Sequence, residues 1–583
     1  MALDAVAVKA VVSELQCLVG GRVDKVHQPE RDEIIISVRT IDTSYRLLVS
    51  ASSANPRIHI TEHTKKNPKT APLFCMLLRK HIGSGKITEI SQVGFERIVK
   101  IAIDSYDELG EYTTKYLYAE IMGRHSNIVL VSQEGRVIDS VKHVDETISS
   151  VREILPGGSY ELPPVQNKIP LLEWGADKDI DFDCPIKADK AILSEISGIS
   201  PLTSREIIYS VFGTTDVISN NINTNKKAMV KLRLQTLAGK VRDNEFSPCV
   251  IEDAASNKLI EFSAIEINQY EKLARVKRYE SMNTLLDDFY YRRDMNERMR
   301  QKTADLLKLL SNHRERIAKK LDILQKTISD AENMDTYRMY ADLITANIYR
   351  ISEGQTYVEA ENYFDENMGT VKIKLDPSLS PSQNAQKYYK KYNKAKTAAI
   401  EAKKQLTASV QDLEYIKSTI SVVETADRIE DVNAVRIELA NEGYIKNSSN
   451  AKKKTKAEIS KPMHFVSSDG FDIYVGRNNT QNDYLSLKFA NSGDLWFHTK
   501  DIHGSHTVIK LGLIKDVPKS TILEAAELAA YYSKARESAQ VPVDYTTIKN
   551  VSKPNGAKPG MVIYDNYNTV YVKPSLIADS DNA

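Results

Sequence analysis

Two long runs of apolar residues, spaced alternately three and four positions apart, constrain the fold of this chain more than any other feature. Residues at this spacing form one apolar stripe along a helix, which is the pattern of a coiled coil. The first run lasts about five heptads and consists of Met299, Thr303, Leu306, Leu310, His313, Ile317, Leu321, Leu324, Ile328 and Ala331. The second consists of Ala399, Ala402, Leu406, Val410, Leu413, Ile416, Ile420 and Val423.

The residues between the two runs contain helix breakers, namely Gly354, Gly369, Pro377 and Pro381. The two helices are therefore predicted to fold back on each other as a long antiparallel coiled-coil hairpin over residues 282–442, with its tip around 347–377. Each stripe would extend about 45 Å, which is more than the interior of a compact domain requires. A helical bundle packed inside one globule is the alternative.

The sequence before the hairpin changes from strand-like to helical. Short β-branched and apolar runs predict a β-rich domain over residues 1–172, and they lie at 33–39, 45–50, 98–103 and 115–121. Residues 173–281 are predicted to be helical. Within them, two apolar helices flank the turn Gly198-Ile199-Ser200, which is the layout of a helix-hairpin-helix. Such a turn can point backbone N–H groups at a phosphate; a plain helical turn is the alternative.

The sequence after the hairpin begins with a lysine-rich segment, 443–460, which we interpret as a basic linker. Strand-like runs around one helix then predict an α/β domain over 461–575, and residues 576–583 are expected to be a disordered tail. The predicted fold class is therefore multidomain α+β.

Composition limits the classes of function. The four cysteines are far apart and form no CxxC pair, which argues against a zinc ribbon or a disulfide scaffold and favours a reducing compartment. No cleavable signal and no apolar run of membrane-spanning length is evident in the sequence, so a cytoplasmic protein without a membrane segment is expected.

The net charge is only +1, so any contact with RNA or DNA must come from local clusters. One cluster spans residues 387–404 and interleaves lysines with Tyr388, Tyr389 and Tyr392. The other contains Lys452, Lys453, Lys454, Lys456 and Lys461. A solvated helix face or linker is the alternative for each.

Several motifs invite a chemical interpretation. The run Gly83-Ser84-Gly85-Lys86 lacks the first glycine and the Ser or Thr of a nucleotide-binding loop, so nucleotide hydrolysis is excluded there. The three histidines at 498, 503 and 506 lack cysteine or acidic ligands at the customary spacing, apart from Asp501, so neither a metal site nor a cofactor is predicted. Glu96-Arg97 can be an ordinary surface pair. The segment 120–127 is denser in Arg, His, Ser and Asn, which suit phosphate or base-edge contacts.

Two long stretches resemble a known family. EIMGRHSNIVL at 120–130, followed by ILPGGSYELPP at 154–164, resembles the N-terminal domain of the NFACT family. The stretch 467–510 is similar to the C-terminal RNA-binding domain of that family, and the length of the chain resembles the bacterial members. The resemblance implies, in order, a formamidopyrimidine-glycosylase-like N-terminal domain, a helix-hairpin-helix, the coiled-coil hairpin and the RNA-binding domain. Glycosylase activity is not expected, because Ala2, Leu3 and Asp4 occupy the end where such enzymes carry a proline.

The resemblance also implies a function. Such a protein would bind a stalled large (50S) ribosomal subunit that carries peptidyl-tRNA, recruit alanyl-tRNA and promote template-free addition of alanines to the nascent chain, which marks it for degradation. The ribosome would form the peptide bond, so an enzyme with catalytic residues is not expected. Implied partners are 23S rRNA and a stalk-base ribosomal protein at the hairpin tip, and the small S4-like RNA-binding protein RqcP; the chain would be monomeric on the ribosome. The alternative is a surface adhesin that binds fibronectin.

The resemblance assigns residues as well. The acid-arginine motif of the family, usually Asp-Arg, falls on Glu96 and Arg97, where glutamate is a departure. A second motif implicated in tRNA recruitment falls on Glu120, Ile121 and Met122, and side-chain chemistry extends the prediction to Arg124, His125 and Asn127. Candidates for rRNA contact in the C-terminal domain are Arg477, Asn478, Trp496, His498, Lys500 and His506.

Overall fold

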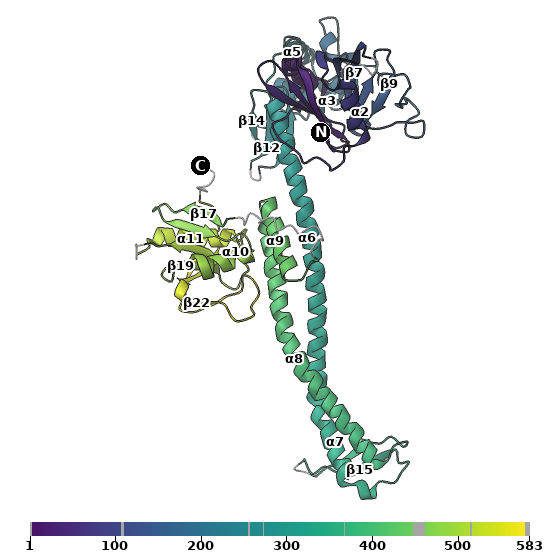
Figure 1. Ribbon diagram of the computed structural model, residues 1–583. Helices are drawn as coiled ribbons and strands as arrows, with labels where there is room; N and C mark the ends of the chain where they lie inside the picture. Colours follow the sequence, from purple (N-terminus) through teal and green to yellow (C-terminus); the bar gives the residue numbers. More distant parts are fainter. Residues whose placement is uncertain are drawn as a thin grey trace. The chain divides into compact units, whose positions relative to one another are not determined.

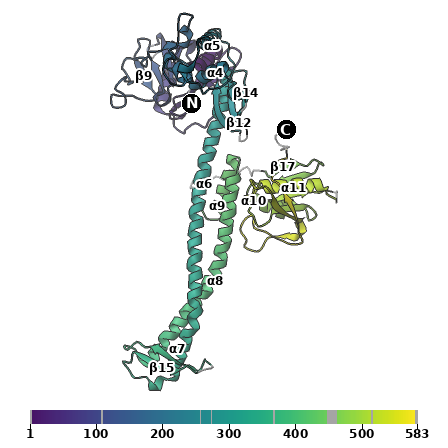
Figure 2. The same cartoon turned by 180° about the vertical axis from the view of Figure 1, so that it is seen from behind.

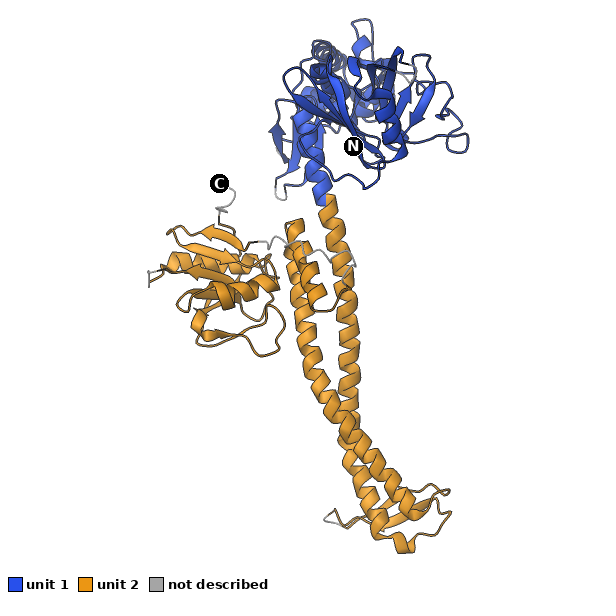
Figure 3. Cartoon of the chain, viewed as in Figure 1, with its two compact units in different colours: residues 1–296 blue, residues 297–583 orange. Residues whose placement is uncertain are grey.

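The computed structural model divides into two compact units, residues 1–296 (unit 1) and 297–583 (unit 2), as Figure 3 shows. It describes residues 3–106, 110–254, 257–271, 273–365, 368–446, 461–512 and 516–577. Most of the predicted basic linker, with Lys452 to Lys456, and the end of the predicted tail lie outside the described residues. The predicted multidomain α+β class is confirmed by a large sheet, a long helical segment and a C-terminal sheet.

Unit 1 contains a nine-stranded antiparallel sheet in the order β4-β3-β2-β1-β5-β6-β7-β8-β9. All four strand-like runs of the sequence form strands in it, whereas the highly charged β1 was not expected. The strands are β1 (Arg22–Glu30), β2 (Glu33–Arg39), β3 (Ser44–Ser50), β4 (Arg57–Ile60), β5 (Lys86–Gln92), β6 (Ile98–Tyr106), β7 (Tyr112–Glu120), β8 (Asn127–Val131) and β9 (Val137–Ser140).

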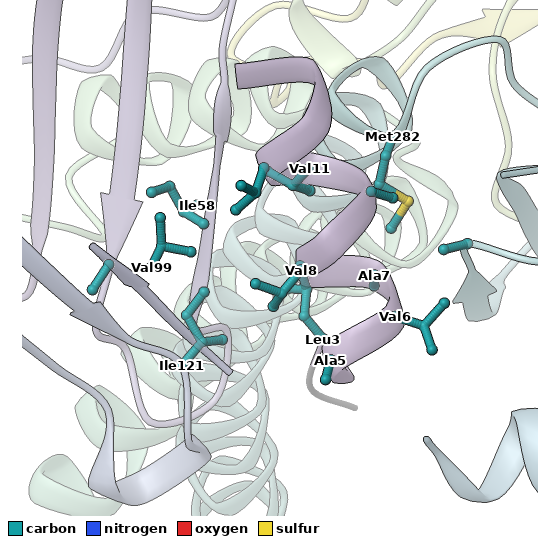
Figure 4. Close-up of a cluster of buried hydrophobic side chains, with 14 of the residues drawn as sticks. Leu3, Ala5, Val6, Ala7, Val8, Val11, Ile58, Val99, Ile121 and Met282 are labelled. Atoms are coloured by element: carbon teal, nitrogen blue, oxygen red, sulfur yellow. The ribbon is translucent and has the colours of Figure 1, made fainter. Parts of the chain in front are cut away.

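Helix α1 (Ala5–Glu14) lies in the core of unit 1. Its first four residues, together with Leu3, are buried among apolar side chains that include Val99 of β6 and Ile121 just after β7 (Figure 4). The helix begins at Asp4, whose side chain accepts a hydrogen bond from the N–H of Ala7. Because this helix has apolar residues on nearly every face, its place at the centre of the fold is expected from hydrophobic burial.

The rest of unit 1 is less helical than the sequence suggested. Helices α3 (Ala188–Glu195), α4 (Pro201–Phe212) and α5 (Thr224–Arg242) are present, and helix α2 (Leu73–Ile82) packs beside β1 and β6. A three-stranded sheet in the order β13-β12-β14 then follows, which the helical prediction for 173–281 did not contain. Its strands are β12 (Cys249–Asp253), β13 (Leu259–Ser263) and β14 (Ala274–Arg278).

The last residues of unit 1 form the start of helix α6 (Met282–Asp330). The Glu14 carboxylate accepts hydrogen bonds from the N–H groups of Met282 and Asn283, at 2.6 and 2.9 Å, and thereby caps the helix. Asp287, one turn further on, accepts a 2.6 Å hydrogen bond from the Thr61 hydroxyl beyond β4. These contacts join α6 to α1 and to the residues just after β4 within unit 1.

The predicted coiled-coil seams pack together in unit 2. There α6 and α8 (Pro381–Thr425) run side by side in Figure 1 and in the rear view of Figure 2. Leu306 and Leu310 of the first seam share one apolar cluster with Ile416 and Val423 of the second and with α9 (Ile429–Asn441). The alternative of a bundle buried inside one globule therefore does not describe this part of the chain.

The hairpin tip has an apolar core of its own. Strands β15 (Tyr357–Glu361) and β16 (Thr370–Lys374) form a two-stranded antiparallel sheet. Helix α7 (Met334–Ala346) and the first turns of α8 complete this core. Leu343, Ile344, Val358, Ile373 and Ala385 are among its buried residues.

The C-terminal part of unit 2 is a six-stranded antiparallel sheet in the order β17-β18-β20-β19-β21-β24, with helix α11 (Lys519–Tyr531) packed on it. The strands are β17 (Met463–Val466), β18 (Asp472–Val475), β19 (Leu495–Thr499), β20 (Thr507–Lys510), β21 (Val541–Thr547) and β24 (Asn568–Val572). In the part of the chain that the structure describes, no helix combines the length and apolar character needed to cross a bilayer.

Candidate nucleic-acid interface

Two motifs that are about 100 residues apart in the sequence line one cavity in unit 1. This site cavity has a volume of about 400 Å³. Glu96 and Arg97 contribute one wall, and the turn at 196–201 before α4 contributes the other. Leu3, Asp4, Ala5, Gln166, Lys168 and Leu193 complete the lining.

The turn that carries Glu96 and Arg97 is held by local hydrogen bonds and by packing. The side-chain amide of Gln92 donates to the carbonyl oxygens of Glu96 and Ala5, at 2.8 and 3.0 Å. Phe95 lies against Gly198, where a Cβ atom would come within 2.3 Å of the phenyl ring. Gly198 is therefore required by close packing as well as by its φ of +88°.

The side chains of Glu96 and Arg97 are half-buried. Within the described residues, neither side chain forms a hydrogen bond or an ion pair, although the Glu96 N–H and the carbonyl oxygens of both residues are hydrogen-bonded. The guanidinium of Arg97 and the carboxylate of Glu96 are therefore available to a ligand that enters the site cavity. A guanidinium can bind a phosphate or a base edge with two parallel hydrogen bonds.

The turn before α4 already has an anionic partner within the chain. The N–H of Ser200 donates a 3.0 Å hydrogen bond to Asp4, and the Thr203 hydroxyl lies 3.3 Å from the same carboxylate. Burial raises the pKa of Asp4, and hydrogen bonds from Ala7, Ser200 and Thr203 oppose that effect. A phosphate at the Ser200 N–H would have to displace this carboxylate. The positive charge of the site cavity therefore comes from Arg97 and from Lys168.

Glu120 and Ile121 lie beneath the surface. Both carboxylate oxygens of Glu120 accept hydrogen bonds from Arg152, at 2.7 and 2.8 Å, and Tyr160 donates a third at 2.8 Å. Burial, followed by the charge of Glu120, raises the pKa of Tyr160 well above its usual value. Ile121 belongs to the apolar core. In this position the two residues can support the loop that follows but cannot touch a ligand themselves.

The loop after β7 divides into exposed and supporting residues. Arg124 and His125 are exposed, and their side chains are joined by a 2.9 Å hydrogen bond. Met122 is half-buried, and its N–H donates to the Ser126 hydroxyl at 2.8 Å. Asn127 is buried and bonds to the backbone of residue 142 through both ends of its amide. Arg124 and His125 are therefore the side chains of this loop that a ligand can reach.

Three of the candidate residues in the C-terminal sheet lie in or against its interior. Trp496 is buried, and its indole N–H donates a 3.0 Å hydrogen bond to Ser486. The same hydroxyl lies 2.7 Å from His506 Nδ1. Burial lowers the pKa of His506 to about 3 and that of His498 to about 4, so both rings are neutral at physiological pH. Trp496 and His506 therefore support the fold, and the half-buried His498 stacks on the indole ring.

The remaining candidates in this sheet have different surroundings. Asn478 caps helix α10 (Asn479–Tyr484) by accepting a hydrogen bond from Gln481 N–H at 2.9 Å. Arg477 lies 3.3 Å from Asp431 of α9, which joins the sheet domain to the helical hairpin within unit 2. Lys500 is 38% exposed and lies 5.0 Å from the centroid of the Tyr567 ring. Among the six candidates, Lys500 is thus the most accessible cation.

The lysine-tyrosine cluster occupies the part of α8 next to the hairpin tip. Lys390, Lys391 and Lys394 are exposed, and Lys391 lies 5.0 Å from the centroid of the Tyr388 ring. Cations alternating with aromatic rings on one surface are suited to phosphates and stacked bases.

The described residues contain no group of three or more His, Cys, Asp or Glu side chains arranged to hold a metal ion.

Two family models and several known proteins match this chain over most of its length. The family model described as NFACT N-terminal and middle domains matches residues 4–458, and the model of the NFACT protein RNA binding domain matches residues 461–566. The chain is 38% identical over 580 residues to the Rqc2 homolog RqcH of Bacillus subtilis, with 98% of each chain covered. It is 32% identical over 587 residues to the protein of the same name in Streptococcus suis, covering 99% of this chain and 98% of that one.

Two further similarities are more distant. The human ribosome quality control complex subunit NEMF is 22% identical, over 90% of this chain and 55% of the human one. A solved structure, that of the fibrinogen binding protein from Staphylococcus aureus, aligns with 50% of this chain and 99% of that chain at 30% identity and a TM-score of 0.42. Since the two family models together span nearly all of the sequence, the chain belongs to the NFACT family.

Proposed function

We propose that this protein is a cytoplasmic, ribosome-associated quality control factor. It binds large (50S) ribosomal subunits that carry a stalled peptidyl-tRNA, recruits alanyl-tRNA and promotes template-free addition of alanines to the nascent chain. The proposal is supported by relatives named for ribosome quality control and by the RNA-binding domain of the family. The observation that carries it is the site cavity, where the ligand-binding atoms of Glu96 and Arg97 have no partner among the described residues.

The site cavity has a size and chemistry suited to part of a tRNA. Its volume of about 400 Å³ lies in the range of clefts that enclose a small ligand. In our proposal Arg97 binds a phosphate or base edge, and the Glu96 carboxylate accepts a hydrogen bond from a base. Because glutamate is one methylene longer than the aspartate usual in the family, its carboxylate reaches further into the cavity.

In this proposal the motif at 120–122 holds the turn of Glu96 and Arg97 in position. The ion pair of Glu120 with Arg152 fixes the end of β7, and the loop that follows presents Arg124 and His125 to the same tRNA. The protein thereby acts by holding the tRNA in place, and the ribosome forms the peptide bond.

The helical hairpin supplies a second contact with the ribosome in this proposal. Its tip exposes aromatic side chains, with Tyr349 76% and Phe364 57% accessible. The adjacent lysine-tyrosine cluster of α8 provides positive charge. We infer that the tip contacts 23S rRNA and a stalk-base protein, that the monomeric chain works with the small S4-like protein RqcP, and that Lys500 contributes to RNA binding by the C-terminal sheet.

The experiment that tests this function compares two double variants, each of which removes an acidic and a basic residue that are neighbours in the sequence. Glu96→Ala with Arg97→Ala should leave co-sedimentation with 50S particles largely intact and abolish alanine tails on a stalled reporter. The matched control is Asp177→Ala with Lys178→Ala, an exposed pair whose charged atoms are 3.7 Å apart; its tails should be normal. Unchanged tails in the first variant would refute the proposal, and recovery of the protein from the cell wall instead of with 50S particles would favour the adhesin.

A further inference from the structure

Three cations lie side by side across neighbouring strands of unit 1. Arg22 on β1 is directly opposite Arg39 on β2 and also opposite Lys86 on β5. All three side chains are exposed. Within the described residues, none of them takes part in an ion pair or a side-chain hydrogen bond. We call these three residues the cation row.

The cation row is unfavourable for the isolated fold. Directly opposite residues on neighbouring strands have Cβ atoms about 5 Å apart, and like charges at this distance repel. Acidic side chains offset the repulsion only in part. Asp104 on β6 lies opposite Lys86, but the Asp104 carboxylate already accepts a 2.8 Å hydrogen bond from the Thr114 hydroxyl. Asp24 lies on β1, two residues beyond the row. A polyanion bound here would attract all three cations and so offset their mutual repulsion.

A second cavity, of about 280 Å³, adjoins the cation row. It lies between β1 and the turn that joins α2 to β5, and its lining includes the cations Lys25 and Arg79, the ring of His27 and one acidic residue, Asp24. The Nε atom of Arg79 donates to the Val26 carbonyl at 2.8 Å, which holds the side chain while leaving its terminal nitrogens free for a ligand. Burial lowers the pKa of His27, and the charges of Arg79 and Lys25 add to that effect.

The glycine-serine turn at 83–85 borders this cavity but does not supply its donors. Ser84 N–H donates to the Val23 carbonyl at 3.0 Å, and Gly85 N–H donates to the Ile82 carbonyl at 3.1 Å. The turn therefore cannot enclose a phosphate with its amides as a nucleotide-binding loop does. An anion bound here would meet cationic side chains, which favours the repeating phosphates of a nucleic acid over a single nucleotide.

The cation row and the site cavity lie at opposite ends of one strand. Lys86 begins β5, and the Glu96-Arg97 turn follows the end of β5 at Gln92. These ends are about 20 Å apart at the usual rise of a strand. One structured RNA molecule can therefore contact both places.

We infer that the cation row, together with Lys25 and Arg79, forms a docking surface for the phosphate backbone of the RNA that Arg97 contacts. This inference rests on the proposed function, because it assigns a second contact to the same tRNA. The surface binds phosphates without reading bases, and so it contributes affinity and orientation but no preference for sequence.

Salt dependence of tRNA binding tests the inference. The full-length protein and a fluorescently labelled tRNA transcript are titrated by anisotropy at several salt concentrations. Each phosphate contact that is lost lowers the slope of log affinity against log salt by about 0.7 to 0.9. We expect Arg22→Gln with Lys86→Gln to lower the slope by about 1 to 2 and not to lower the melting temperature, because it relieves repulsion.

A control variant and a replacement variant accompany the salt titration. The control Lys187→Gln with Lys190→Gln removes two exposed charges, one just before α3 and one in its first turn, and should leave the slope unchanged. If the row variant unfolds more readily, Lys25→Gln, at an exposed position beside the second cavity, takes its place, with an expected loss of about one contact. An unchanged slope overturns the inference. If Arg97→Ala still weakens tRNA binding in that case, the proposed function survives; if the unaltered protein binds no tRNA at low salt, both fail.

Discussion

The backbone N–H of Ile121 donates a 2.8 Å hydrogen bond to the carbonyl oxygen of Arg97. This one bond connects the turn of the acid-arginine motif to the end of β7, where the second motif begins. Below it, Glu120 is fixed by Arg152 and Tyr160. The half-buried Arg97 is thus aligned by a buried network, and changes in that network should affect both stability and RNA binding.

The buried pair of Glu120 and Arg152 gives a first prediction. Arg152→Ala leaves the Glu120 carboxylate buried without its counter-charge, which should destabilise unit 1 by about 3 to 5 kcal/mol. The chain has two tryptophans, Trp174 in unit 1 and Trp496 in unit 2. Urea unfolding followed by fluorescence in a Trp496→Phe background therefore reports on unit 1. The control Arg124→Ala, at an exposed position, should change the unfolding free energy by less than about 0.5 kcal/mol.

The base of helix α6 gives a prediction about pH. Burial by itself would raise the pKa of Asp287, but hydrogen bonds from His59, Thr61 and the Glu62 N–H lower it from 3.8 to about 2. The ionised form is therefore favoured in the folded state. This contribution, about 2 kcal/mol, is fully present above about pH 4 and is lost as the pH falls through about 2.

The variant Asp287→Asn isolates this contribution from the other carboxyl groups. It should be less stable than the unaltered protein at pH 6, and the difference in unfolding free energy should shrink as the pH is lowered through the interval from 3.8 to about 2. The same fluorescence measurement checks it. A difference that stays constant with pH would contradict the assigned hydrogen bonds.

The exposed aromatic residues of the hairpin tip give a prediction about ribosome binding. Tyr349→Ala with Phe364→Ala should weaken 50S binding by at least about tenfold, because each stacked aromatic contributes ~1–3 kcal/mol. Co-sedimentation with purified 50S particles measures the effect. The control Ile323→Ala removes a side chain that is 66% exposed on the arm and should bind normally. Equal binding by both variants would exclude the tip as the contact.

Glu438 on α9 gives a prediction about the attachment of the C-terminal sheet. Its buried carboxylate accepts hydrogen bonds from Tyr415 on α8 and from Asn479 and Thr480 of the sheet domain. Glu438→Ala leaves these donors unpaired, at about 1–3 kcal/mol each. Hydrogen exchange at residues 479–484 should accelerate by at least about tenfold while the strands of the sheet remain protected. Glu414→Ala, which removes a partly exposed carboxylate 3.5 Å from His503, should change the exchange little.

The heptad pattern predicted the hairpin well because a coiled coil is determined by local periodicity. Leu306 and Leu310 are buried on the first seam as expected, although Val410 of the second seam is 46% exposed. The strands β12 to β14 were missed because each has only five residues and carries charges. Such strands are recognisable only once their neighbours are known.

The sequence singled out the two motifs that line the site cavity but did not indicate that they line it together. Family resemblance marked Glu96 and Arg97, yet the spacing of about 100 residues gave no sign that the turn before α4 faces them across one cavity. Trp496 and His506 were also predicted to contact rRNA, and both are buried. An aromatic ring can stack on RNA at the surface or pack in a core. Only burial distinguishes these uses.

The separate apolar core of the hairpin tip has an evolutionary consequence. Its buried residues, such as Leu343 and Ile373, belong to a different cluster from those that hold the arms together. Insertions of whole heptads can therefore lengthen the arms without disturbing the tip, and the tip can be exchanged between relatives as an interchangeable part. The reach of the hairpin and the identity of what it touches are thus free to diverge independently.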